Sequence, residues 1–176
     1  MFKHLIAAIF LGLFSFFAYL LIHLGVFKPV LISEENGPAM KLIYKEHTGA
    51  YHKIIEVIKE VEDWAKKSNI DCSRSFGEYI DKPGELDEAR LRSRGGCWVD
   101  EFPKNIPPDF KTQEYPVRNY IKAVFEGSPS IGPWKVYGKV EDFAEDSRKK
   151  IKGATLEVYV IHSAEKMTTT YFFPIE

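Results

Sequence analysis

Net charge, cysteine and nucleotide-binding motifs are scarce in this sequence, and each scarcity argues against a class of function. The 24 Lys and Arg residues are balanced by 25 Asp and Glu residues, which gives a formal net charge of -1, so no basic field points to nucleic acid as a partner. The 2 cysteines allow at most one internal disulfide and form no metal-site pattern. There is no glycine-rich phosphate loop and no nucleophile elbow, so we expect no metal and no cofactor.

Charged side chains are also absent from residues 5–27, a run built mostly of Leu, Ile, Ala and Phe. A helix of this length rises about 34 Å, enough to cross a hydrocarbon core of about 30 Å. The apolar region of a cleaved signal is typically about 7–15 residues long and is followed by a small-residue cleavage site. The run here is longer, and residues 26–30 offer no such site. A core helix buried by its neighbours is a further alternative.

The sequence therefore predicts a single-pass membrane protein with an N-terminal anchor at residues 1–28, in contact with the lipid bilayer through residues 5–27. Lys3 lies before the span, and Lys28 and Lys41 lie after it. Because positive charge near a span normally stays cytoplasmic, this nearly even distribution leaves the side of the soluble domain open.

An internal repeat organises the rest of the chain. Residues 61–65 (VEDWA) recur as residues 140–144 (VEDFA), and the same offset takes Glu78 to Glu157. Self-similarity of this kind indicates two related structural units. We predict a linker and then one domain made of two repeat halves, with bounds at 29–40 for the linker, 41–176 for the domain, and about 41–99 and 116–175 for the halves.

Each half has the pattern of a strand, a helix and two further strands. The predicted elements are a strand at 41–47, a helix at 51–67 and strands at 73–81 and 89–99, then a strand at 119–126, a helix at 134–151 and strands at 154–162 and 167–174. We predict an α+β fold in which this tandem repeat forms one antiparallel sheet with two helices on one face, preceded by a transmembrane helix. The opposite face of the sheet, or the boundary between the halves, would then be free to bind a ligand. The loop at 100–115 would connect the halves.

The two cysteines fall in the first half. If the first hairpin turns at residues 83–86, Cys72 lies about opposite Cys97, which would allow a cross-strand disulfide in an oxidising compartment. The alternative is two unpaired thiols.

Four short segments, in this order and spacing, resemble a known family. They are residues 44–51 (YKEHTGAY), 79–83 (YIDKP), 156–159 (LEVY) and 171–175 (YFFPI). Together they are similar to the GyrI-like small-molecule-binding domain family, and the apolar N-terminus is similar to that of its membrane-anchored members. The resemblance covers about residues 41–175.

The resemblance implies a binding site between the two halves. In the family, a carboxylate on a strand of the second half lies in an aromatic-lined cleft and recognises flat, lipophilic cations, and by resemblance this carboxylate is Glu157. Tyr159, Trp134 and Tyr51 are the aromatic residues best placed to contribute, and Glu78, which the repeat aligns with Glu157, is a second candidate carboxylate. A cation in an apolar cleft needs an opposing charge, and each aromatic face adds about 0.5–2 kcal/mol of cation–π attraction. Otherwise Glu157 would be an ordinary solvent-facing strand residue, and Trp134 would pack onto the core at a helix start.

The sequence leads to three hypotheses about function. The first is a membrane-tethered binder of small lipophilic, cationic molecules that is not an enzyme. The alternative is a structural or protein-interaction module without a ligand. A weaker alternative is a hydrolase of reactive electrophiles that uses a Glu and a Tyr in the same cleft.

Overall fold

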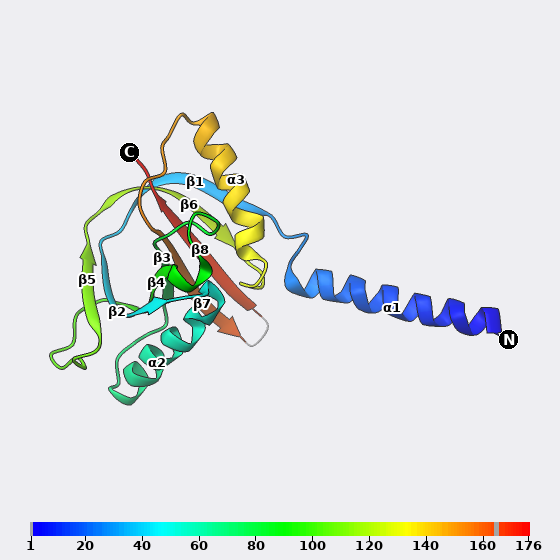
Figure 1. Ribbon diagram of the computed structural model, residues 1–176, viewed down its shortest axis with the longest axis horizontal. Coiled ribbons are helices and arrows are strands. Elements are labelled where there is room, and N and C mark those ends of the chain that lie inside the picture. The colour runs from blue at the N-terminus through cyan, green and yellow to red at the C-terminus, as the bar shows by residue number, and fades with distance from the viewer. Residues whose placement is uncertain (1, 164–165) are drawn as a thin grey trace.

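Two helices of the domain lie on one face of a curled antiparallel sheet, and an N-terminal helix projects away from it (Figure 1). The computed structural model describes residues 2–163 and 166–176. The helices are α1 (Phe2–Leu24), α2 (Ile54–Lys67) and α3 (Gly132–Asp146), with short 3-10 helices η1 (Tyr51–Lys53) and η2 (Glu88–Arg90). The predicted α+β class is confirmed.

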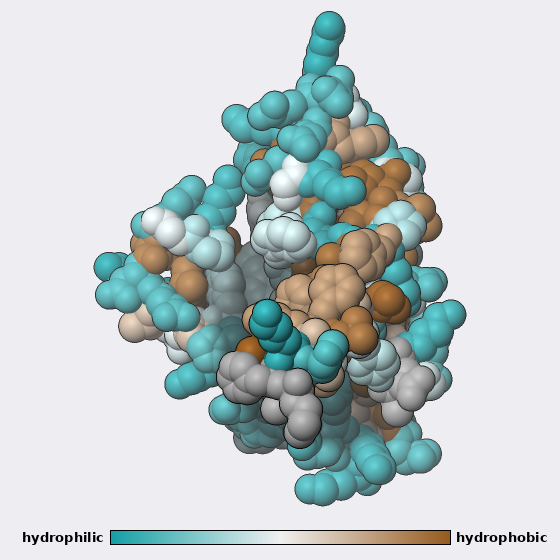
Figure 2. Space-filling model, turned by 90° about the vertical axis from the view of Figure 1, so that its right-hand side faces the viewer, coloured by the Kyte–Doolittle hydropathy of each residue, from teal (hydrophilic) through white to brown (hydrophobic). Residues whose placement is uncertain are grey.

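Helix α1 carries the apolar run that the sequence places at residues 5–27. Within the described residues, its segment Ile6–Leu24 is long and apolar enough to cross a membrane, and none of that segment is buried against the domain. Figure 2 looks along α1 onto the face of the domain from which it extends. The helix is thus a candidate membrane anchor.

The sheet is assembled from two halves that meet in its centre. Its strands follow the order β1-β6-β8-β7-β3-β4-β2-β5, and each neighbouring pair is antiparallel. The strands are β1 (Val30–Gly37), β2 (Met40–Thr48), β3 (Ser75–Tyr79), β4 (Arg92–Val99), β5 (Lys111–Tyr115), β6 (Arg118–Phe125), β7 (Thr155–Ser163) and β8 (Lys166–Pro174). We call the central junction, where β3 pairs with β7, the seam.

Two segments that lie outside the predicted repeat halves are strands. The predicted linker at 29–40 contains β1, and the predicted loop at 100–115 ends in β5. Each strand precedes one half in the chain but pairs with the other half, β1 with β6 and β5 with β2. Both occupy sheet edges, where one ladder of hydrogen bonds suffices and polar residues are tolerated, so neither has a strong strand pattern.

The helices follow the predicted apolar stripes. Helix α2 buries Ile54, Ile58, Val61 and Ala65 at steps of three and four residues, and α3 buries Val136, Val140 and Ala144 at steps of four. Helix α3 ends earlier than the predicted 151, because Ser147 Oγ donates to the carbonyl of Phe143 and Arg148 takes a left-handed conformation (φ 55°).

The face of the sheet without helices is filled by its own side chains. Apolar residues of β2, β3, β6, β7 and β8 pack against one another there: Met40, Leu42, Tyr44, Phe76, Tyr120, Leu156, Val158 and Phe172. All of them are at most 5% exposed. Because the curled sheet buries this face, the helix side of the seam is the better candidate for a site.

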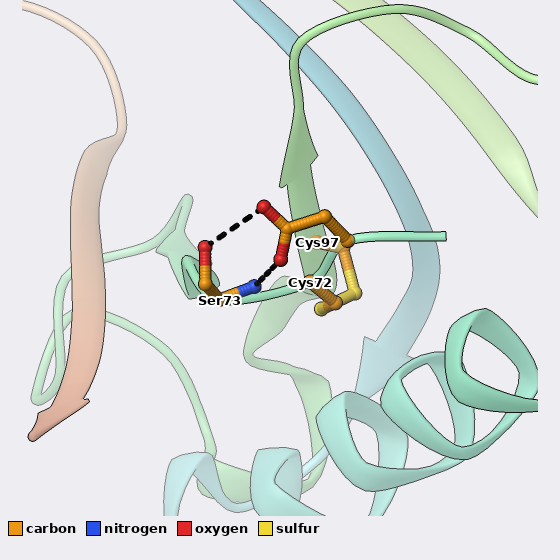
Figure 3. Close-up of a disulfide and its surroundings, with 4 residues drawn as sticks. Cys72, Ser73 and Cys97 are labelled. Carbon is orange, nitrogen blue, oxygen red and sulfur yellow. Dashed lines mark hydrogen bonds between the residues drawn. A yellow bond between two sulfur atoms is a disulfide. The ribbon is translucent and has the colours of Figure 1, made fainter. Parts of the chain in front are cut away.

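A disulfide joins Cys72 to Cys97 (Figure 3). Cys97 lies in β4, fully buried, and pairs across the ladder with Ser75 rather than with Cys72. Cys72 instead lies in the segment before β3, where the backbone N–H of Ser73 donates to Asp71 Oδ1 at 2.9 Å. This local turn takes Cys72 out of the strand, so the expected direct opposition is replaced by a bridge from β4 to the approach to β3.

Candidate functional site

Glu157 lies on the helix side of the seam, in the middle of the sheet. On β7 it is directly opposite Gly77 of β3 and Tyr171 of β8, and Gly77 is in turn opposite Gly95 of β4. A Cβ atom on Gly77 would lie 3.0 Å from the hydroxyl oxygen of Tyr79. Gly77 therefore leaves room beside the carboxylate for Tyr79, whereas Gly95 leaves room for Ile58 of α2.

Tyrosine hydroxyls surround the Glu157 carboxylate. Tyr137 Oη, from α3, donates to Glu157 Oε1 at 2.9 Å, and Tyr159 Oη donates to Oε2 at 3.1 Å. Tyr79 Oη lies 3.0 Å from Tyr159 Oη, which extends the chain of hydroxyls across the seam. No Lys, Arg or His forms an ion pair with Glu157 in residues 2–163 and 166–176.

Burial dominates the electrostatics of this group. Glu157 is 3% exposed. Desolvation raises the pKa of its carboxyl from 4.5 to about 7, although the two tyrosine hydrogen bonds act in the opposite direction. Burial, and then the nearby carboxylate, raise the pKa of Tyr137 and Tyr159, so both remain hydrogen-bond donors at neutral pH. The site therefore holds a carboxyl group that titrates near neutrality and has no cationic partner among the described side chains.

We expect the free energy of unfolding of the protein to fall as pH rises from about 5 to about 8. The pKa of Glu157 is higher in the folded chain, at about 7, than its ordinary value of 4.5, so the folded state binds the proton more tightly. Stabilisation is complete below about pH 4.5 and is lost as pH rises toward 7 and above. The expected loss between pH 5 and pH 8 is about 2.5 kcal/mol.

Denaturant unfolding of the full chain in detergent measures this pH dependence. Glu157→Gln should flatten the profile and be the more stable protein at pH 8. Parallel profiles for the two proteins would contradict a raised pKa of Glu157.

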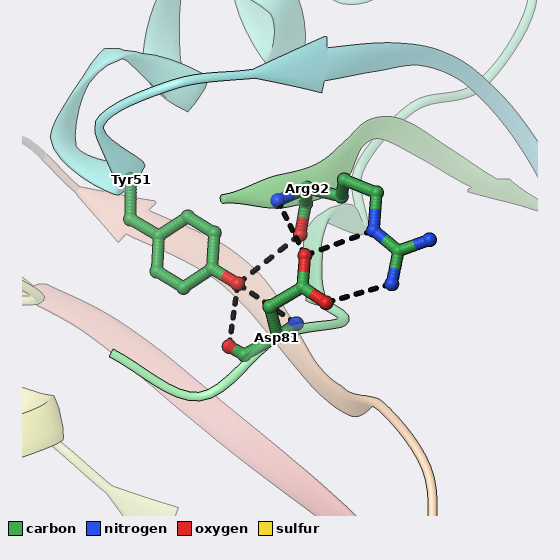
Figure 4. Close-up of polar contacts among 3 residues, drawn as sticks. All are labelled: Tyr51, Asp81 and Arg92. Atoms are coloured by element: carbon green, nitrogen blue, oxygen red, sulfur yellow. Dashed lines mark hydrogen bonds and ion pairs between the residues drawn. The ribbon is translucent and has the colours of Figure 1, made fainter. Parts of the chain in front are cut away.

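Tyr159 and Tyr51 both join this region, at different distances from the carboxylate. Tyr159 contacts Glu157 directly, whereas Tyr51 packs its ring edge-on against Tyr79 with centroids 4.8 Å apart. The Tyr51 hydroxyl lies 2.6 Å from the carbonyl oxygen of Asp81, whose carboxylate binds the guanidinium of Arg92 (Figure 4). Tyr51 thus fixes the outer edge of the site through Tyr79.

Glu78 lies on the other face of the sheet, which corrects its prediction as a second carboxylate of the same site. It is opposite Leu156, one position away from the pair formed by Gly77 and Glu157. Since successive strand residues point to opposite faces, this single step separates the two glutamates. Glu78 instead accepts from Arg94 Nη1 at 3.0 Å and from Tyr115 Oη at 2.6 Å.

Trp134 is not among the side chains that contact Glu157. It is 80% exposed on the first turn of α3, so it packs on neither the site nor the core. It lines a surface hollow of about 390 Å³ together with Val26, Lys135, Gly138, Lys139 and Asp142. Residues 134, 138 and 142 form a stripe on the side of the helix away from its buried residues.

Sequence reasoning missed Tyr137 and Tyr79. Tyr137 stands three residues before the buried Val140 and seven before Ala144, so helical periodicity does place it toward the sheet. Tyr79 follows Gly77 by two residues and shares its face. Neither signal identifies a contact with Glu157 without the register of β3 against β7.

The site is closed. Glu157 is covered by its tyrosines, and the hollow beside Trp134 and a second one of about 450 Å³ lie elsewhere, the second lined by Thr48, Leu86, Ala89, Arg90 and Arg92. Within residues 2–163 and 166–176, no cluster of three or more His, Cys, Asp and Glu side chains is arranged to hold a metal ion.

Comparison with known proteins relates the whole domain to one family. The family model of the GyrI-like small molecule binding domain matches residues 32–176. The sequence has no significant match among curated proteins.

Solved structures share the fold at low sequence identity. EcmrR in a DNA complex has a TM-score of 0.66 at 17% identity, and the match covers 93% of this chain and 65% of that one. Its isolated C-terminal domain has a TM-score of 0.65 at 16% identity, with 84% and 98% covered. SAV2435 bound to tetraphenylphosphonium has a TM-score of 0.56 at 10% identity, with 83% and 94% covered. A hydrolase from Listeria innocua has a TM-score of 0.53 at 13% identity, with 82% and 91% covered.

Proposed function

Since this chain belongs to the GyrI-like small-molecule-binding domain family, we propose that it binds a small lipophilic cation at Glu157, in the seam between its two halves, and that α1 tethers this site to a membrane. One observation carries the proposal. Among the residues that the structure describes, a carboxyl group that is 3% exposed has only hydroxyl partners, although a buried carboxylate is strongly stabilised by a cation.

The chemistry of the surroundings supports a flat aromatic cation. Tyr137 and Tyr159 contact the carboxylate, and Tyr137 packs against Tyr171 and Phe173 with ring centroids 6.2 and 5.2 Å away. Such rings offer both apolar contact and cation–π attraction. SAV2435, which shares the fold, is bound to tetraphenylphosphonium. Because the site is closed, binding requires Tyr137 or Tyr159 to rotate away from Glu157.

The membrane part of the proposal rests on α1 and on the disulfide. An apolar helix of this length fits a bilayer, and none of its span Ile6–Leu24 is buried against the domain. Disulfides persist in oxidising compartments, so the Cys72–Cys97 bridge supports a domain on the oxidising side of the membrane with the N-terminus on the cytoplasmic side.

Binding of tetraphenylphosphonium to the full chain in phosphatidylcholine nanodiscs tests the ligand class. We expect saturable binding above the partitioning seen with empty nanodiscs, and much weaker binding of triphenylphosphine oxide, which presents similar aromatic surface without a net charge. Absence of saturable binding by both compounds would favour the structural or protein-interaction module instead.

A hydrolase is a second candidate because Glu157 has a pKa of about 7 and two tyrosine hydroxyls on its carboxyl oxygens. A carboxylate of this pKa can act as a general base toward water, and a tyrosine can donate a proton to the leaving oxygen. Hydrolysis of a small epoxide by the full chain, abolished by Glu157→Gln, would support this function over binding alone.

A further inference from the structure

Two highly exposed aromatic side chains lie close to the end of α1. Phe27, three residues after α1, is 74% exposed, and Trp134 on α3 is 80% exposed. A tryptophan with this exposure leaves most of its apolar surface in water, and nothing in the Glu157 site uses it.

Hydrogen bonds hold the start of α3 against the end of α1. The backbone N–H of Ser128 donates to the carbonyl of Leu24 at 3.0 Å. Lys135 Nζ donates to the carbonyl of Lys28 at 2.6 Å and also to that of Val26. If α1 spans a bilayer, residues 24–28 lie at its surface, so Lys135 must lie there as well. Trp134 lines a hollow together with Val26 and Lys135, so it lies at the same level.

The orientation of the elements agrees with this placement. Helix α3 runs across the direction of α1, and the β7–β8 hairpin lies on the same side of the domain as α1 (Figure 1). Ile161, near the end of β7, is 63% exposed.

The charged side chains near Trp134 are compatible with binding to phospholipid headgroups. Lys28 and Lys139 are exposed, and neither forms an ion pair in the part of the chain that the structure describes. The hollow beside Trp134 also has an acidic side chain in its lining, that of Asp142. Tryptophan is enriched at the level of lipid headgroups, where its ring is in apolar contact and its N–H remains hydrated, and lysine extends to the phosphates.

We propose that Trp134, Phe27, Lys28 and Lys139 form a membrane-contact surface, which holds α3 of the domain against the lipid headgroups beside α1. This inference rests on the proposed anchoring by α1. It adds that the folded domain itself touches the bilayer in a fixed orientation, rather than hanging from a flexible tether.

Quenching of tryptophan fluorescence by brominated lipid tests the surface. The full chain is placed in phosphatidylcholine vesicles whose acyl chains are brominated near the headgroup, and in the same vesicles without bromine. Bromine should remove about one third of the emission, because Trp134 is one of 3 tryptophans and is the one at the lipid surface. Trp134→Phe should lose this bromine-dependent decrease, and since the side chain is 80% exposed the variant is expected to fold.

A matched variant and flotation separate this inference from the anchor. Trp98→Phe removes a half-buried tryptophan of β4 that stacks under Arg74, and it should keep the bromine-dependent decrease. Flotation with the vesicles together with equal emission in both lipids would overturn the contact surface and leave the anchor intact. Failure to float would overturn both. A decrease that persists in Trp134→Phe would also overturn the assignment to Trp134.

Discussion

Glu157→Gln should weaken binding of tetraphenylphosphonium about a hundredfold at pH 8. Removing one partner of a desolvated charge pair typically costs about 2–5 kcal/mol, and about 2.7 kcal/mol corresponds to a factor of a hundred in Kd. The amide keeps the shape of the side chain and still accepts the hydrogen bond of a tyrosine, so the change isolates the charge.

The affinity for tetraphenylphosphonium should also depend on pH. A cation selects the ionised carboxylate, and the pKa of Glu157 is about 7, so the wild-type protein should bind about tenfold more tightly at pH 8 than at pH 6. The affinity of Glu157→Gln should change little over this interval. Isothermal titration in nanodiscs at both values of pH measures all four constants.

Glu78→Gln is the matched control, because it removes the same charge from the other face of the same central sheet. Its affinity for the cation should stay within about twofold of wild type. Its stability should fall by about 2 kcal/mol, since Arg94 loses its carboxylate partner in a partly buried site. Equal losses of affinity in the two variants would contradict a specific role of Glu157.

Reduction of the Cys72–Cys97 disulfide should lower the free energy of unfolding by about 3 kcal/mol. The bridge closes a loop of 25 residues, and the loss of chain entropy in the unfolded state accounts for about this amount. Cys97 also belongs to the core under α2, next to Val61 and Ala65, so its thiol would stay buried after reduction.

Urea unfolding of the full chain in detergent, with and without reductant, measures this difference. The double variant Cys72→Ser, Cys97→Ser is the control and should be insensitive to reductant. Maleimide labelling of the unfolded, unreduced protein from its native membrane reports the compartment. Two reactive thiols in that protein would contradict the disulfide and the proposed oxidising side.

The sequence alone determined the elements whose pattern depends on local periodicity. The stripe at Ile54, Ile58, Val61 and Ala65 recurs every three or four residues, and only a helix brings these side chains to one face. The uncharged run at residues 5–27 predicts a helix for the same kind of local reason. The antiparallel sheet with its helices on one face followed from the repeated order of these elements.

The tertiary structure decided which glutamate faces the tyrosines. An offset of 79 residues aligns the two helices well, since it takes buried Val61 to buried Val140. The same offset makes Glu78 the counterpart of Glu157. In the sheet, however, the residue of β3 that lies opposite Glu157 and shares its face is Gly77. A shift of one residue changes little along a broad helical stripe, but it moves a strand side chain to the opposite face. For this reason the sequence identified Glu157 as a candidate, while the pairing of β3 with β7 separated it from Glu78 and brought Tyr79, Tyr137 and Tyr159 around it.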